Sequence, residues 1–375
     1  MQKQISFELN PSQELVPPAS NTGAQSTGQR ILIDWFAFTL PHGSKIFEVI
    51  GIPGNEWVPI ETKAMGYDRM YLHGQMKVYE SEREDMGVHC EFSGSACREY
   101  EFFFDNNWKD LIQRIRKNSG HFSRIDLAID DFDGTFTLAQ IEEKIKNSEI
   151  ISYFRKSRIL EEYNLSAKDN LGKTIYFGSP QSRIRIRMYD KAIEQLLKEQ
   201  YDRESEAIRI ESKAKLSPKD CKENKRNREE EYRKQRLEHE KQWIRTEIQS
   251  RDERSDAIAD YILADIKIGE VVFGVLKNYL NFVEPSNTDI NKSRWEITPF
   301  WQKFLGNIEE LKLTTEKMQN TIKRIKNWII KQVAPSLALL SLDKELKVNL
   351  EELVEIILFA KSRLKKRHYA MLQAS

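Results

Sequence analysis

The chain has 375 residues, of which 31% are charged and 10% are aromatic, and its formal net charge is +1. This length can hold two domains with a sizeable core, and the aromatic content argues against disorder throughout. The small net charge gives no global reason for nucleic-acid binding, so such a function must rest on local patches. The scattered cysteines form no CxxC pair, which argues against a zinc finger or a disulfide framework.

The N-terminal segment, residues 1–28, is rich in Ser, Pro, Gln, Asn and Gly without periodicity, and we expect a disordered leader there. Its first residues are polar and do not resemble a signal peptide. No apolar run approaches the roughly 20 residues that a membrane-spanning helix needs. Together with the cysteine usage, these features predict a cytoplasmic protein without a membrane span.

The next region, residues 29–255, contains short segments rich in β-branched and aromatic residues, bounded by Gly, Pro and Ser. Helices are predicted at 108–118 and 137–148, and the strands at 87–94 and 98–104 are expected to pair across a short turn. This mixture predicts an α+β fold with an antiparallel-rich central sheet and helices on one face. The predicted strands are 31–40, 87–94, 98–104, 123–130, 173–178, 182–191 and 243–251.

Two further regions have helical patterns. Residues at about 196–241 are densely charged, and Ser217 followed by Pro218 is a helix start signal, so we expect a long exposed helical arm. From residue 256 to 375, apolar residues recur at three- and four-residue spacing, which predicts an α-helical C-terminal domain.

The polar residues of the predicted strands carry the candidate chemistry. Side chains two residues apart share a face of a strand, so Asp34 is expected on the face of Phe36 and Phe38. An ordinary solvated face of an antiparallel sheet alternates in the same way, and for a single strand this alternative stays open. The remaining polar faces are Arg124, Asp126 and Asp130; Arg185, Arg187, Tyr189 and Lys191; and Arg245, Glu247, Gln249 and Arg251.

These residue types point to phosphoryl transfer. Converging carboxylates suit Mg²⁺ or Mn²⁺, and arginine forks suit phosphate oxygens. A tyrosine hydroxyl is a poor nucleophile at its free pKa of roughly 10. It can attack phosphorus when a metal polarises the phosphate and a neighbouring base or cation assists loss of its proton.

Six segments occur in chain order: IDWFAF, HCEFSGSACR, SRIDLAIDDFDG, TIYFGS, IRIRMYDK and WIRTEIQSR. Together they resemble the replication initiation factor family, which includes rolling-circle plasmid initiators and related relaxases of integrative conjugative elements. The resemblance covers about residues 30–255, and RWEITPFWQKFL and KNWIIKQVAPSLALL resemble the continuation in the conjugative-element members.

The resemblance implies specific roles. Tyr189 becomes the nucleophile that forms a 5′-phosphotyrosyl link, and Lys191 is expected as a second catalytic residue that contacts phosphate. Asp126 and Glu247 become the ligands of a divalent metal, with Asp34 as a third candidate. The residues implied to contact DNA phosphates are Arg124, Arg185, Arg187, Arg245 and Arg251.

The histidines and a second tyrosine bear on this assignment. The histidines never fall two apart, so the two-histidine metal motif of other nicking enzymes is not encoded, and His89 is expected to have a structural role. Tyr176 is a rival nucleophile, although its neighbours are Thr and Gly rather than Arg and Lys.

We therefore predict metal-dependent, site- and strand-specific DNA nicking and rejoining by residues 29–255, most simply as the relaxase of an integrative conjugative element. A plasmid rolling-circle initiator is the alternative within this class. A non-catalytic DNA-binding regulator on the same fold and a phosphodiesterase that uses water are the alternatives outside it. The expected partners are origin DNA, a separate helicase because no Walker motif is present, and a second copy of the chain in a homodimer.

Overall fold

The chain forms two compact units, Met1–Thr314 and Thr315–Ser375. In the second unit, helix α12 (Leu350–Lys361) is described. The predicted leader lies outside the described residues except for Gly28, as does most of the predicted C-terminal helical domain beyond Gly306. The computed structural model describes residues 28–164, 169–238, 242–306, 311, 313, 326, 329, 334, 337 and 350–361.

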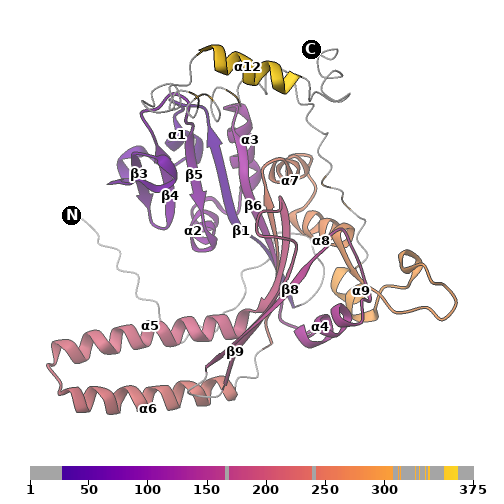
Figure 1. Ribbon diagram of the computed structural model, residues 1–375. Coiled ribbons are helices and arrows are strands. Elements are labelled where there is room, and N and C mark those ends of the chain that lie inside the picture. The colour runs from indigo at the N-terminus through magenta and orange to yellow at the C-terminus, as the bar shows by residue number, and fades with distance from the viewer. Residues whose placement is uncertain are drawn as a thin grey trace. The chain divides into compact units, whose positions relative to one another are not determined.

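The first unit is built on a ten-stranded sheet with the order β2-β3-β4-β5-β1-β6-β11-β10-β9-β8, in which neighbouring strands pair antiparallel (Figure 1). This confirms the predicted antiparallel-rich sheet. A small second sheet pairs β7 (Ile150–Ser152) with β12 (Leu280–Phe282). The large sheet comprises β1 (Gln29–Leu40), β2 (Val58–Glu61), β3 (Arg69–His73), β4 (Met76–Glu80), β5 (Val88–Phe92), β6 (His121–Asp131), β8 (Ser157–Asn164), β9 (Asp169–Phe177), β10 (Ile184–Asp190) and β11 (Ile244–Arg251).

Helices cover the apolar face of the sheet. Phe36 of β1 packs against Trp108 of α3 with ring centroids 4.9 Å apart, and Ile248 of β11 belongs to the same buried core. Burial of such large side chains is the main favourable term in folding. The helices around this core are α1 (Ile46–Ile50), α2 (Gly94–Phe104), α3 (Trp108–Lys117), α4 (Leu138–Lys146), α7 (Glu253–Leu263), α8 (Ile268–Tyr279) and α9 (Pro299–Leu305).

One predicted strand is a helix. Residues 98–104 lie in α2, so the expected hairpin after β5 does not exist and the segment SGSAC contains the start of this helix. Cys97 and Tyr100 are fully buried, while Phe102 is 79% exposed. The aromatic run resembles a strand because aromatic residues have β-propensity, but this propensity yields to packing. Here Tyr100 stacks on Phe92 of β5.

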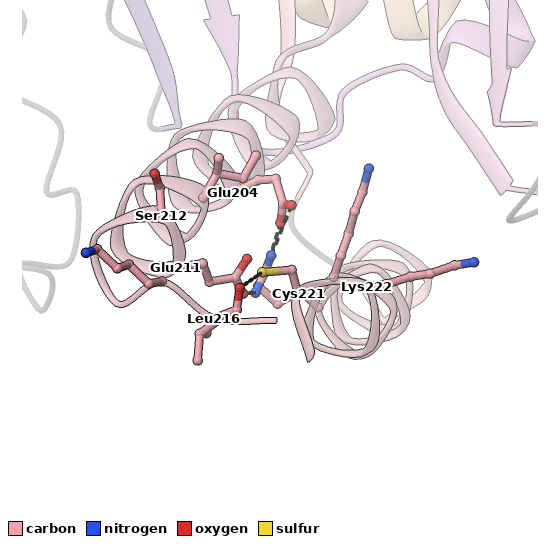
Figure 2. A pocket seen from close by; sticks show the side chains of 10 residues that line it. Glu204, Glu211, Ser212, Leu216, Cys221 and Lys222 are labelled. Atoms are coloured by element: carbon pink, nitrogen blue, oxygen red, sulfur yellow. Dashed lines mark hydrogen bonds and ion pairs between the residues drawn. The ribbon is translucent and has the colours of Figure 1, made fainter. Parts of the chain in front are cut away.

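The predicted charged arm is a hairpin of two antiparallel helices, α5 (Lys191–Lys213) and α6 (Pro218–Leu237) (Figure 1). The Ser217 side chain accepts a hydrogen bond from the backbone of Asp220, with Pro218 in the first turn, as the sequence predicted. A pocket of about 470 Å³ lies between the helices near their turn, where Arg228 is paired with glutamates of α5 (Figure 2).

The helices after β11 pack on the sheet. The Ser255 hydroxyl of α7 accepts a hydrogen bond from the backbone of Ile125 in β6, and it lies 3.0 Å from the hydroxyl of Ser250 in β11. The boundary predicted near residue 255 therefore falls inside the first compact unit, which runs to Thr314. Among the residues that the structure describes, no helix is long and apolar enough to cross a membrane.

Candidate functional site

The strand register brings the predicted polar residues of β10 and β11 together on one face. Arg187 pairs with Glu247, and Tyr189 pairs with Arg245. On the other side of β11, Arg245 pairs with Asp130 of β6. Directly opposed side chains in an antiparallel pair lie close enough to interact. Residues more than 50 positions apart in the chain thus form one cluster.

Tyr189 lies at the centre of this cluster. Its side chain is buried, with 5% of the residue exposed, and its hydroxyl donates a hydrogen bond of 2.7 Å to Oε1 of Glu247. Arg187 donates to both oxygens of Glu247, over 3.0 Å and 2.7 Å, and its guanidinium lies 4.3 Å from the centroid of the Tyr189 ring. The tyrosine is therefore held by an ion pair rather than exposed to solvent.

The electrostatics of the cluster keep the Tyr189 hydroxyl protonated. Burial raises the pKa of Tyr189 well above its usual value, and the negative charge of Glu247 raises this pKa further. Arg187 and Arg245 act in the opposite direction. Since the hydroxyl already donates to Glu247, this carboxylate is the acceptor in place to take its proton.

Arg245 lies behind the tyrosine in a buried network. Its Nε and one terminal nitrogen donate to Asp130 over 2.6 Å and 2.9 Å, and its other terminal nitrogen donates to Asp34 over 3.0 Å. Despite burial, Arg245 and Arg30 hold the pKa of Asp130 below its usual value. These contacts with two carboxylates orient Arg245, and its predicted contact with DNA phosphate stays a prediction.

Asp34 reaches this face through a β-bulge, which corrects the predicted alternation. The pairing steps from Ile33 opposite Leu127 to Trp35 opposite Asp126, so Asp34 is an extra residue in β1. Phe36 therefore points into the core instead of sharing a face with Asp34. A side chain at Gly94 would come within 3.0 Å of the Asp34 carboxylate, so glycine leaves room for it.

Asp126 belongs to the same face, between Trp35 and the strand of Glu247. Arg124 donates to both of its oxygens and stacks 4.1 Å over the ring of Trp35. Burial raises the pKa of Asp126 to about 6. Arg124 opposes this rise in the pKa, while the charges of Glu247 and Asp34 add to it.

The charges of Glu247 and Asp34 thus act on Asp126, and each of these three predicted metal ligands is paired with an arginine. Their oxygens are the donor type that Mg²⁺ and Mn²⁺ prefer, so the residues fit a divalent cation in chemistry. Within the described part of the chain, no three His, Cys, Asp or Glu side chains are assembled as a metal site. Binding of a cation by Asp126, Glu247 and Asp34 therefore requires that these side chains rearrange.

Lys191 does not lie on the strand as predicted. Strand β10 ends at Asp190, whose carboxylate caps α5 by accepting a hydrogen bond of 2.9 Å from the backbone of Ile193, so Lys191 is the first residue of the helix. Its ammonium lies 5.6 Å from the centroid of the Tyr189 ring and forms an ion pair with Glu194. The lysine therefore remains beside the tyrosine.

The remaining predicted residues lie toward the β8 edge and the end of β11. Arg185 stacks 3.9 Å over the ring of Tyr176, the rival nucleophile, and Arg251 donates to the carbonyl of Pro180 over 2.8 Å. Sequence reasoning did not select Asp130 as a site residue, although it lies at the same-face spacing from Asp126. It also missed Arg158 of β8, which pairs with Tyr176.

Comparisons with known proteins show the family of the chain. The family model described as replication initiation factor matches residues 120–217 and 224–357, and the model for the N-terminal domain of rolling circle replication initiation proteins matches residues 30–114. The proposed DNA relaxase NicK of Bacillus subtilis (strain 168) is 28% identical over 313 residues, which cover 82% of this chain and 78% of NicK.

A solved structure shows the same fold. The rolling circle replication initiator protein from Geobacillus stearothermophilus aligns with a TM-score of 0.59 and 28% identity, covering 77% of this chain and 100% of that one. Fold and site thus define a protein of the DNA-nicking initiator class. More specifically, the chain belongs to the replication initiation factor family, whose model matches more than half of its residues.

Proposed function

We propose that this protein nicks and rejoins one strand of origin DNA through a 5′-phosphotyrosine at Tyr189, in a metal-dependent reaction, as the relaxase of an integrative conjugative element. The observation that carries the proposal is the hydrogen bond from the Tyr189 hydroxyl to Glu247 amid arginines that suit phosphate. The similarity to NicK favours a relaxase, while the similarity to the Geobacillus initiator favours a plasmid initiator as the second candidate.

The cleavage step follows from these positions. The phenolic proton passes to Glu247 as the Tyr189 oxygen forms a bond to phosphorus. The bond from phosphorus to the 3′ oxygen breaks, and this oxygen takes up the proton that Glu247 received, directly or through solvent, to become a free 3′-hydroxyl. Because no water enters, the phosphotyrosine keeps the energy of the phosphodiester, and attack by a 3′-hydroxyl reverses the step.

The surrounding charges assist this exchange. Arg187 balances the charge of Glu247 and contacts the ring of the nucleophile. Lys191 adds positive charge near the tyrosine, which favours the developing phenolate. A Mg²⁺ or Mn²⁺ ion held by Asp126, Glu247 and Asp34 would polarise the scissile phosphate. A helicase for unwinding and a second copy of the chain complete the proposed partners.

The test is covalent capture of labelled single-stranded DNA that tiles the region upstream of the coding sequence. With Mn²⁺ or Mg²⁺, the wild-type protein should form a slowly migrating, protease-sensitive band on a denaturing gel. Tyr189→Phe should abolish this band, whereas Tyr176→Phe should still form it. Cleavage without an adduct, equal in Tyr189→Phe, would identify a hydrolytic nuclease, and binding without cleavage on every tile would identify a regulator.

A further inference from the structure

Three arginines beside the tyrosine cluster are not paired with a carboxylate among the residues that the structure describes. Arg158, Arg185 and Arg251 form no ion pair with any carboxylate of the described residues, whereas Arg187 is paired with Glu247. The Arg251 side chain donates to the backbone carbonyl of Pro180. Positive charges that the protein itself leaves unbalanced indicate a surface for an anionic ligand.

The arginines gather around Tyr176 through the strand register. Tyr176 of β9 lies opposite Arg187 on one side and opposite Arg158 of β8 on the other. Arg185 lies one same-face step along β10 from Arg187, and its guanidinium covers the Tyr176 ring at 3.9 Å. An aromatic ring and a guanidinium plane are the two surfaces on which unpaired bases stack.

Arg185 also carries an unused donor. Its Nε is buried and has no hydrogen-bond acceptor among the described residues. Burial lowers the pKa of Arg185, and the positive charges of Arg187, Arg158 and Arg251 lower this pKa further, while Tyr176 opposes them. A phosphate would supply both the missing acceptor and the missing negative charge.

We propose that Arg158, Arg185 and Tyr176 form a second nucleotide subsite, which binds a phosphate and a base of the single strand next to the cleaved position. The inference rests on the proposed function and concerns how the protein binds the single strand that it cleaves. Arg185 lies four residues from Tyr189, roughly 14 Å along the strand, so it contacts a neighbouring nucleotide rather than the scissile phosphate. The bound strand therefore extends from Tyr189 toward the β8 edge of the sheet.

The test measures binding of a short fluorescent oligothymidylate to the full chain by anisotropy, with chelator present and Tyr189→Phe as the common background. Arg185→Gln and Arg158→Gln should each weaken binding about tenfold and reduce the slope of log Kd against log salt by about 0.7 for each lost phosphate contact. Tyr176→Leu should weaken binding roughly tenfold with the slope unchanged. The matched control is Arg183→Gln, since Arg183 is 58% exposed and paired with Glu253.

The result that overturns the subsite is wild-type affinity and wild-type salt slope in both Arg185→Gln and Arg158→Gln. Arg158 is exposed on an edge strand, so Arg158→Gln should fold and its oligonucleotide affinity can be measured even where Arg185→Gln fails to fold. An equal loss in Arg183→Gln would also overturn it, because the effect would then be general charge. If the covalent adduct forms at Tyr189 while these variants bind normally, the subsite alone is wrong. If adduct formation does not depend on Tyr189, the proposed function itself is wrong.

Discussion

The Tyr189 hydroxyl and the Glu247 carboxylate are joined by a hydrogen bond of 2.7 Å across two neighbouring strands of the sheet. The two residues are diagonal partners, since Glu247 lies directly opposite Arg187 and not opposite Tyr189. The Glu247 carboxylate thereby accepts hydrogen bonds both from Tyr189, the proposed nucleophile, and from Arg187, whose guanidinium lies over the tyrosine ring. In the proposed reaction Glu247 is the base, and its hydrogen bond to the Tyr189 hydroxyl already provides the path for proton transfer.

The first prediction concerns Glu247→Gln, which keeps the size of the side chain but cannot accept the phenolic proton as a base. Adduct formation in a single turnover should slow by about 10²- to 10⁴-fold, while oligonucleotide binding is retained. Glu253→Gln, at the first residue of α7 directly after β11, is the control and should react near the wild-type rate. A Glu247→Gln rate within about threefold of wild type would show that another group takes the proton.

The second prediction concerns metal and pH. Chelation should stop adduct formation without preventing oligonucleotide binding. Because burial raises the pKa of Asp126 to about 6, protons compete with a cation below this pH. Mn²⁺ affinity should be full above pH 6 and fall by up to tenfold for each pH unit below it.

Thermal shift with Mn²⁺ at several pH values measures this competition. Asp126→Asn should abolish the Mn²⁺-dependent rise in Tm, whereas Asp260→Asn, an exposed carboxylate of α7, should preserve it. A Mn²⁺ response in Asp126→Asn equal to that of wild type would exclude Asp126 as a ligand.

The third prediction concerns the Arg187–Glu247 pair. Arg187→Met leaves the buried Glu247 charge without its cation and should lower the free energy of unfolding by about 2 kcal/mol, less than for a fully buried pair because the Arg187 side chain is 28% exposed. Replacing both residues by methionine should recover most of this loss, since no unpaired charge then remains. Urea denaturation of the two single variants and the double variant gives the coupling, and simple additivity would contradict it.

The fourth prediction concerns His89. Burial, with help from His121, lowers the pKa of His89 to about 4, so the folded protein keeps it neutral while the unfolded chain protonates it near pH 6.5. Its contribution is therefore present above pH 6.5 and is lost as pH falls toward 4, by roughly 3 kcal/mol at most. His89→Gln should flatten the dependence of unfolding free energy on pH in this window. A slope unchanged from wild type would mean that other groups cause it.

Much of the fold could be predicted because its strands carry strong local patterns. The alternation in IRIRMYD and IRTEIQSR placed Arg187 and Tyr189 on one face and Glu247 on another strand's polar face, as the structure has them. The helix start at Ser217 was equally local. The strand prediction for residues 98–104 was wrong because aromatic residues favour a strand locally, whereas contacts of Tyr100 with Phe92 and Trp108 stabilise a helix.

By itself the sequence determined the residue types on each strand face and the order of the motifs, because alternation and capping act over a few neighbouring residues. Only the tertiary structure decided which faces meet. The register that sets Tyr189 against Glu247, and the bulge that turns Asp34 toward Arg245, depend on pairing between strands far apart in the chain. Burial of the common core selects this pairing, and a local sequence pattern does not predict which distant strands pair.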